Sequence, residues 1–143
     1  MINGLDLFSG IAGISLALAP WVRPLAYCEN DRYAQSVLLS RMAERQIFLA
    51  PIWDDIRTLR GEQYKGIIDI IYGGFPCQDI SIAGKGEGIT GERSGLWSEM
   101  FRVIRRVRPK YIIIENSPML AIRGFETILC NLSEIGYYAE WQC

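Results

Sequence analysis

Two side chains that could act together in catalysis follow two apolar, strand-like runs of the sequence. Cys77 comes shortly after the run 67–72, and Glu115 directly follows the run 111–114. Because ligands of an open parallel sheet bind beyond the carboxyl ends of its strands, a thiol and a carboxylate placed there could converge on one substrate. We therefore take Cys77 and Glu115 as the candidate catalytic pair.

The absence of histidine from the sequence narrows this chemistry. It excludes serine triads, Cys–His proteases and metal sites with histidine ligands. A nucleophilic cysteine must then be activated by backbone N–H groups of a loop, by a helix terminus or by the substrate itself. The four cysteines also lack the C-x-x-C spacing of a zinc ribbon or a redox pair, so no metal site is predicted. We expect Cys28 and Cys130 to be small buried side chains of the core.

The length of 143 residues predicts a single domain, residues 1–143, that is large enough to bury a core. The net charge of −1 lacks the basic excess that proteins usually show when they grip a nucleic-acid duplex. The sequence shows no signal peptide, and no uncharged run is long enough to span a membrane. These features predict a cytoplasmic protein without a membrane partner.

A contact with nucleic acid would have to come from a local patch, and the densest basic run lies within residues 102–110. Apolar residues alternate with the basic ones there, so the solvated face of an amphipathic helix explains the run at least as well. The basic residues are Arg102, Arg105, Arg106, Arg108 and Lys110.

Short apolar strands alternate with helical patterns along the chain, which predicts an α/β fold built on parallel strands. Residues 73–94 carry six glycines and no periodicity, so we expect a mobile loop there. Asn30 is the expected N-cap of the second helix. We expect strands at residues 3–7, 25–29, 47–49, 67–72, 111–115 and 137–142, and helices at residues 13–19, 31–43, 95–107 and 119–134.

The turn after the first strand carries two glycines, Gly10 and Gly13. They would let the backbone approach a ligand closely, but the turn lacks the full G-x-G-x-x-G pattern of a pyrophosphate site. The second strand ends at Glu29, about 20 residues on, where an acid can accept hydrogen bonds from ribose hydroxyls. A glycine turn alone would be attributed to helix packing. With the acid at this separation, the pattern favours a nucleoside site that lacks a phosphate cradle.

Taken in order, these motifs resemble those of the cytosine-C5 DNA methyltransferases over almost the whole chain. Residues 6–10 with Gly13 are similar to the family's first S-adenosylmethionine motif. Gly74-Phe75-Pro76-Cys77-Gln78 is similar to its catalytic motif, and Glu115-Asn116 lies 38 residues after Cys77, in the place of its Glu-Asn-Val motif. Ser117-Pro118 stands where valine is usual, which affects only the expected local packing.

The resemblance implies a Rossmann-like fold of S-adenosylmethionine-dependent methyltransferases, with a mostly parallel sheet covered by helices on both faces. It implies that Cys77 is the nucleophile and Glu115 the acid that contacts the base. The cofactor residues that it implies are Phe8, Ser9, Gly10, Gly13, Glu29, Asp55, Ile56, Pro76 and Leu96. The implied substrate or DNA contacts are Gln78, Ser81, Arg93 and Asn116.

The chemistry of this family explains these residue types. Cytosine C5 is too weak a nucleophile to attack a sulfonium methyl group until a thiolate has added to C6. The resemblance gives this addition to Cys77 and gives Glu115 the stabilisation of charge at the ring nitrogen N3. Since the base is inaccessible within a duplex, the nucleotide would be flipped out, and the 73–94 loop would close behind it.

The family pattern continues with elements that follow the sixth strand. They are a Gln-x-Arg-x-Arg motif, a seventh strand, a target recognition domain and a segment that completes the cofactor pocket. We therefore expect a fold truncated before the seventh strand, with weak binding of double-stranded DNA and low activity for the chain alone. We also expect either self-association through unpaired strand edges or complementation by a C-terminal polypeptide.

Three alternatives remain open at the level of the sequence. The chain could be a non-catalytic remnant, a subunit of a split methyltransferase, or a tRNA cytosine-5 methyltransferase. A prokaryotic or phage restriction-modification system is the expected origin of the DNA-modifying form.

Overall fold

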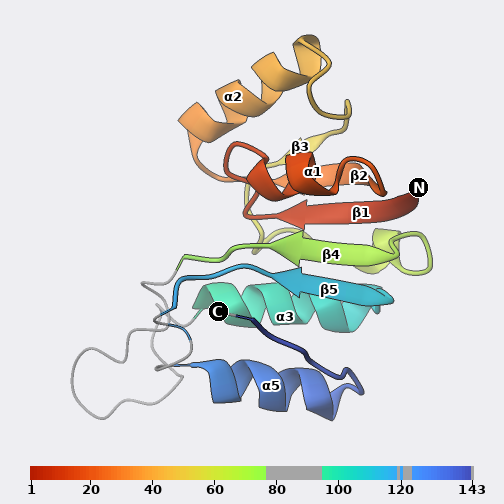
Figure 1. The fold of residues 1–143 in the computed structure, drawn as a ribbon, viewed down its shortest axis with the longest axis vertical. Coiled ribbons are helices and arrows are strands. Elements are labelled where there is room, and N and C mark those ends of the chain that lie inside the picture. The colour runs from red at the N-terminus through yellow and green to blue at the C-terminus, as the bar shows by residue number, and fades with distance from the viewer. Residues whose placement is uncertain (77–94, 119, 121–123, 143) are drawn as a thin grey trace.

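The computed structural model describes residues 1–76, 95–118, 120 and 124–142. Its centre is a five-stranded sheet with the strand order β3-β2-β1-β4-β5, in which every neighbouring pair is parallel (Figure 1). The strands are β1 (Ile2–Leu7), β2 (Val22–Cys28), β3 (Ile52–Trp53), β4 (Ile70–Gly73) and β5 (Tyr111–Ile114). The helices are α1 (Gly13–Leu18), α2 (Arg32–Ala43), the 3₁₀ helix η1 (Glu62–Tyr64), α3 (Gly95–Val107) and α5 (Phe125–Glu134).

One face of the sheet carries the larger core cluster. Because side chains alternate between the two faces of a strand, Leu5, Leu7 and Ile71 all point to this side. They pack there with Met100 and Ile104 of α3, and α5 contributes to the same cluster. All of the five named side chains are fully buried.

The opposite face is covered by the first two helices. Ile70 and Tyr72 of β4 pack against Leu18 of α1, and Tyr27 of β2 packs with Leu38 of α2. Helices therefore cover both faces of a parallel sheet, which confirms the predicted fold class.

Most of the predicted elements form close to their expected positions. The strands expected at 3–7, 25–29, 67–72 and 111–115 correspond to β1, β2, β4 and β5. The expected helices at 13–19, 31–43 and 95–107 correspond to α1, α2 and α3. Of the helix expected at 119–134, α5 forms the second part and Leu120 is helical, while residues 119 and 121–123 lie outside the described residues.

Two predicted strands are wrong. Residues 47–49 form no strand, because Ile47 is instead buried against the cluster of Tyr27 and Leu38, and β3 pairs with β2 a few residues later. Residues 137–142 form no strand either. The Tyr137 N–H closes the end of α5 by donating to the Leu132 carbonyl, so that backbone group is not available for a ladder.

The predicted N-cap of α2 is also wrong by one position. Asp31, rather than Asn30, caps the helix, and its carboxylate accepts a hydrogen bond from the Ala34 N–H at 2.8 Å. Asn30 is left free to line a cavity that is described below.

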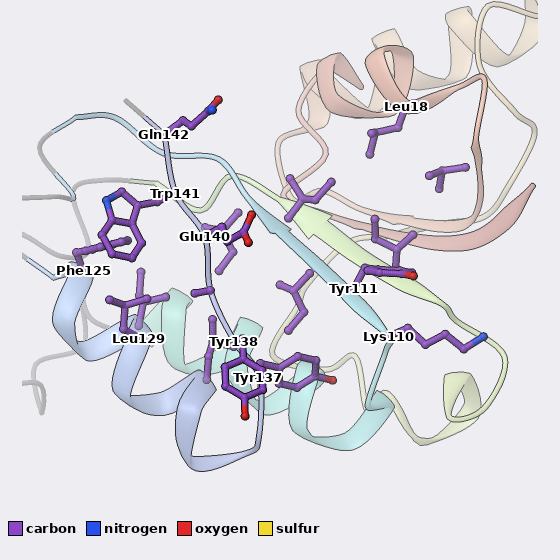
Figure 2. A pocket seen from close by; sticks show the side chains of 18 of the residues that line it. Leu18, Lys110, Tyr111, Phe125, Leu129, Tyr137, Tyr138, Glu140, Trp141 and Gln142 are labelled. Atoms are coloured by element: carbon purple, nitrogen blue, oxygen red, sulfur yellow. The ribbon is translucent and has the colours of Figure 1, made fainter.

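β5 lies at the edge of the sheet and leaves part of its surface uncovered. Among the described residues it pairs only with β4, and its Tyr111 and Ile113 side chains are 59% and 39% exposed. A groove of about 610 Å³ runs beside it, between β5, α5 and residues 137–142 (Figure 2). Trp141 lies across this groove with its ring 5.1 Å from the ring of Phe125, edge to face.

No helix in the described part of the chain is both long and apolar enough to cross a membrane.

Candidate active site

The glycine turn between β1 and α1 has a left-handed backbone at three positions. The φ angles of Phe8, Gly10 and Ala12 are 55°, 51° and 67°. Side chains with a Cβ pay for this conformation, so other contacts must hold the turn in place. Ser9 supplies two of them, because its N–H donates to the Cys28 carbonyl at 3.1 Å and its hydroxyl accepts from the Cys28 N–H at 3.2 Å. These contacts tie Ser9 to the end of β2, and its cofactor role stays a prediction.

Glu29 joins this turn to the start of α2. One carboxylate oxygen accepts the Gly10 N–H at 2.7 Å, and the other accepts the Asp31 N–H at 2.8 Å. A carboxylate offers about four lone-pair sites, so two acceptor positions remain for a ligand. The half-buried side chain stands at the carboxyl end of β2, where the sequence predicts a ribose contact.

A cavity of about 660 Å³ opens beside Glu29, between β2, α2 and α3. Its volume lies in the range of sites for small molecules and cofactors. It brings together five of the predicted cofactor residues, and the residues on either side of Glu29 also line it. The five are Phe8, Asp55, Ile56, Pro76 and Leu96. The other four predicted cofactor residues, Ser9, Gly10, Gly13 and Glu29, are not among the residues that line it.

The loop that carries Asp55 and Ile56 is held in place by hydrogen bonds from Arg102 of α3. Its guanidinium donates to the Ile56 carbonyl at 2.7 Å and to the Leu59 carbonyl at 2.9 Å, and it pairs with Glu99. The two-pronged contact fixes the loop in both position and direction.

Several side chains that line the cavity were not predicted from the sequence. Gln35 is the clearest, because its amide donates to the Glu29 carbonyl oxygen at 2.6 Å. Its position one turn into α2, on the side of the β2 end, is the signal that could have found it. Asn30, Arg32 and Asp54 also line the cavity and lie just after strands that end there. Ser36, Leu39 and Arg57 complete the set of unpredicted polar, charged or aliphatic residues around it.

Of the two cysteines that were expected to be buried, Cys28 agrees with the prediction and Cys130 does not. Cys28 is 3% exposed, and burial, reinforced by the charge of Glu29, raises the pKa of its thiol to about 12. It therefore stays protonated and unreactive at neutral pH. Cys130 is exposed, so the expectation that it is a buried core side chain is wrong. It lies on the outer side of α5, whose buried positions are Ile128 and Leu132.

The carboxyl ends of β4 and β5 lie side by side. The Glu115 N–H donates to the Gly73 carbonyl at 3.1 Å, and the Asn116 amide donates to the Phe75 carbonyl at 2.9 Å. A Cβ on Gly74 would stand only 2.7 Å from a carboxylate oxygen of Glu115, so the absence of a side chain lets that carboxylate lie against the Gly74 backbone.

The segment after β4 is also fixed from the core side. Phe75 is buried and packs on Trp97 of α3, with ring centroids 5.6 Å apart. Trp97 in turn donates to Asn131 of α5 at 3.0 Å. The described part of the segment ends at Pro76, and Cys77, Gln78, Ser81 and Arg93 lie outside the described residues, as does most of the predicted loop.

The basic run has a structural role in this fold. Besides the Arg102 contacts, Arg106 donates to the Arg60 carbonyl, Arg108 donates to the Ile135 carbonyl, and Lys110 pairs with Asp69 at 2.9 Å. These contacts favour the interpretation of the run as one face of an amphipathic helix over a patch for nucleic acid.

Residues 2–143 match the family of C-5 cytosine-specific DNA methylases. The chain belongs to this family. The DNA methylase match favours the predicted DNA substrate class over the tRNA alternative.

Relatives of this DNA methylase chain are Type II methyltransferases of bacteria and a virus. It is 33% identical to M.CviJI of Paramecium bursaria Chlorella virus IL3A over 138 residues, which are 96% of this chain and 36% of that protein. It is 38% identical to M2.BsuMI of Bacillus subtilis (strain 168) over 141 residues, with coverage of 92% and 34%. The chain thus spans about a third of the length of the curated relatives that it matches.

Solved structures share the fold at lower identity. A DNMT2 variant from Spodoptera frugiperda superposes with a TM-score of 0.72 at 20% identity, over 94% of this chain and 41% of that one. The Entamoeba histolytica methyltransferase EhMeth superposes with a TM-score of 0.76 at 19% identity, over 96% and 45% of the two chains. These similarities support the methyltransferase fold of this DNA methylase chain.

Proposed function

We propose that this chain is the cofactor-binding and catalytic part of a DNA cytosine-5 methyltransferase. The observation that carries the proposal is the cavity beside Glu29, which collects Phe8, Asp55, Ile56 and Leu96 and extends to Pro76. Pro76 directly precedes Cys77 in the sequence, and the Glu115 carboxylate lies against Gly74 of the same segment. In this proposal the cofactor site and the catalytic acid lie at the carboxyl ends of the strands.

The residues of this cavity fit S-adenosylmethionine, which would supply an electrophilic methyl group. Glu29, at the end of β2 beside the cavity, would offer its remaining acceptor positions to the ribose hydroxyls. Asp55 and Ile56 would offer an acid and an apolar side chain to adenine. Phe8, Pro76 and Leu96 would enclose the ligand and exclude water.

In this proposal Cys77 and Glu115 act on the flipped cytosine. The Cys77 thiolate adds to C6, and the ring electrons move toward C5 while Glu115 stabilises the charge at N3. C5 would form its bond to the methyl group as the sulfonium–methyl bond breaks and leaves a neutral thioether. A base then removes the C5 proton, the C6–S bond breaks, and the Cys77 thiolate is released. Glu115 is exposed, so its carboxylate is accessible to an incoming nucleobase.

Covalent trapping on DNA that contains 5-fluorocytosine tests this mechanism, because fluorine at C5 blocks the last elimination. The chain would be assayed with the C-terminal polypeptide that restores methylation. Cys77→Ser should abolish trapping, and Cys130→Ser, which changes an exposed cysteine elsewhere, should not. Trapping that survives in Cys77→Ser would refute the proposed nucleophile.

We also propose that a polypeptide strand completes the sheet at β5. The exposed Tyr111 and Ile113, the groove of about 610 Å³ and the aromatic Trp141 at its rim support a partner that is extended and apolar on one face. Relatives about three times as long as this chain have the polypeptide to provide it. Self-association through the same edge is the expected behaviour when that polypeptide is absent. The cytoplasm of a prokaryotic cell remains the predicted location.

A further inference from the structure

A row of three buried polar side chains crosses the sheet below the glycine turn. Asp6 of β1 stands in register with Tyr27 of β2 on one side and with Tyr72 of β4 on the other. Asp6 is 1% exposed and both tyrosines are fully buried. Ser15 of α1 lies above this row, also buried. A carboxylate in such a place is costly unless hydrogen bonds hold it.

Tyr72 is joined to Asp6 through a hydrogen-bond chain. The Ser15 hydroxyl donates to the Asp6 carboxylate at 2.6 Å and lies 2.8 Å from the Tyr72 hydroxyl. The hydroxyl of Tyr27 donates to the Phe48 carbonyl at 3.1 Å, and the Ser15 hydroxyl is near enough to lower its pKa against the effect of burial. Tyr72 therefore bonds to Ser15, whereas the bond that holds the Tyr27 hydroxyl runs to the loop of Phe48.

The chain of hydrogen bonds spans the glycine turn. Asp6 lies just before the turn and Ser15 just after it, in the first turn of α1. The Asp6 main-chain carbonyl also accepts the Ser9 hydroxyl at 3.1 Å. Since Phe8 and Ala12 hold a left-handed backbone between these anchors, the anchors must offset the strain.

We infer that Asp6, Ser15 and Tyr72 are positioning residues for the cofactor, because their hydrogen-bond chain clamps both ends of the turn that presents the Gly10 backbone. Without these hydrogen bonds, only apolar contacts would hold α1, and because such contacts are not directional the helix could rotate. The Gly10 N–H would then lose its fixed place beside Glu29. This inference rests on the proposed cofactor site.

Hydrogen exchange of the unliganded chain gives a readout that does not depend on activity. Tyr72→Phe, which removes one buried hydrogen bond, should speed exchange in residues 8–12 roughly tenfold, and Ser15→Ala, which removes two, should speed it at least as much. The amides of β1 and β4 should stay protected. Asp6→Asn, which keeps an acceptor for Ser15, should preserve the protection of the turn, whereas Asp6→Leu should not.

Matched controls separate this role from general packing. Tyr27→Phe removes a hydroxyl from the same buried row that is bonded to the Phe48 carbonyl, and it should loosen residues 45–49 more than the turn. Ser40→Ala removes a helical hydroxyl that contacts Glu44 on α2 and should change neither. Unchanged exchange at residues 8–12 in Tyr72→Phe and Ser15→Ala, or an equal rise over the whole sheet, would overturn the positioning role.

Calorimetry with S-adenosylhomocysteine then separates this inference from the proposed function. We expect the wild-type chain to bind, Tyr72→Phe and Ser15→Ala to weaken binding at least roughly tenfold, and Tyr27→Phe to weaken it clearly less. Binding that is equal in all of them would refute the positioning role alone. A wild-type chain that does not bind would refute the proposed cofactor site, and the positioning role with it.

Discussion

Asp6 is the residue whose environment departs furthest from that of an ordinary carboxyl group. Burial raises its pKa to about 7, and the Glu29 charge adds to this, while the Ser15 and Ser9 hydroxyls oppose it. Tyr27 and Tyr72 face it from β2 and β4, and burial followed by the Asp6 charge raises the pKa of each of them. No cationic side chain contributes to its shift.

This raised pKa predicts that Asp6 makes the fold less stable as pH rises. The unfolded chain releases the proton near pH 4, whereas the folded chain keeps it until about pH 7. The folded state therefore binds more protons between these values, and its free energy of unfolding falls by up to about 4 kcal/mol across them. Above pH 7 the loss is complete.

The test compares urea unfolding of the wild type and Asp6→Asn from pH 4 to pH 8. The difference between the two proteins isolates Asp6 from other carboxyl groups, and the wild type should lose stability relative to Asp6→Asn as pH rises. Parallel pH profiles for the two proteins would show that Asp6 does not titrate in this range.

At the scale of elements, the sequence predicted the strands and helices that carry the site because their apolar runs are also their buried faces. Leu5 and Leu7 alternate in β1, and Met100, Val103, Ile104 and Val107 follow a helical period in α3. The two wrong strand predictions have one physical source, because apolar or aromatic residues can also pack outside a sheet. Ile47 packs on Tyr27 from a loop, and residues 137–142, three of which are aromatic, lie beside β5 without pairing to it.

Some residues of the candidate site could likewise be predicted from the sequence, and others could not. Glu29 could be found because it ends the second predicted strand at a recognisable spacing from the glycine turn, whereas Asp55 was found through the family resemblance. The hydrogen-bond chain of Asp6, Ser15 and Tyr72 could not, because it joins positions up to 66 residues apart that only the register of β1 with β4 brings together. Sequence periodicity records which face is buried, but not which polar atoms meet there.

Arg102 provides a prediction at this scale, since it links α3 to the loop of Asp55 and Ile56. Arg102→Lys keeps the charge but cannot serve both carbonyls, so we expect a loss of about 1–3 kcal/mol in the free energy of unfolding. Cofactor affinity should fall with it. Chemical unfolding and calorimetry would measure the two effects.

Arg105→Lys is the matched control, because Arg105 lies on the exposed side of α3 with its guanidinium 6.0 Å from the Phe101 ring. It should change stability by less than about 0.5 kcal/mol. Equal effects of the two substitutions would contradict the special role of Arg102.

At the scale of the whole molecule, the β5 edge determines how the chain associates. Its open ladder and exposed Ile113 predict concentration-dependent self-association, measurable by sedimentation velocity. Ile113→Lys should shift the chain toward the monomer, because a charge at an edge strand opposes pairing. Leu49→Lys, which changes an exposed apolar residue elsewhere, should not.

A C-terminal polypeptide from a longer relative should compete for the same edge. We expect it to suppress self-association of the wild type and to bind Ile113→Lys more weakly. Self-association that is identical in Ile113→Lys and the wild type would show that β5 is not the interface.

The central claim is that the cavity beside Glu29 holds S-adenosylmethionine, and calorimetric titration of the 143-residue chain tests it most directly. We expect saturable binding that Glu29→Gln and Glu29→Ala weaken roughly ten- to a hundredfold, as loss of hydrogen bonds to a charged acceptor predicts. Glu44→Ala, at the far end of α2, should bind like the wild type. Binding that is indifferent to both Glu29 substitutions, or no binding by the wild type, would contradict the account.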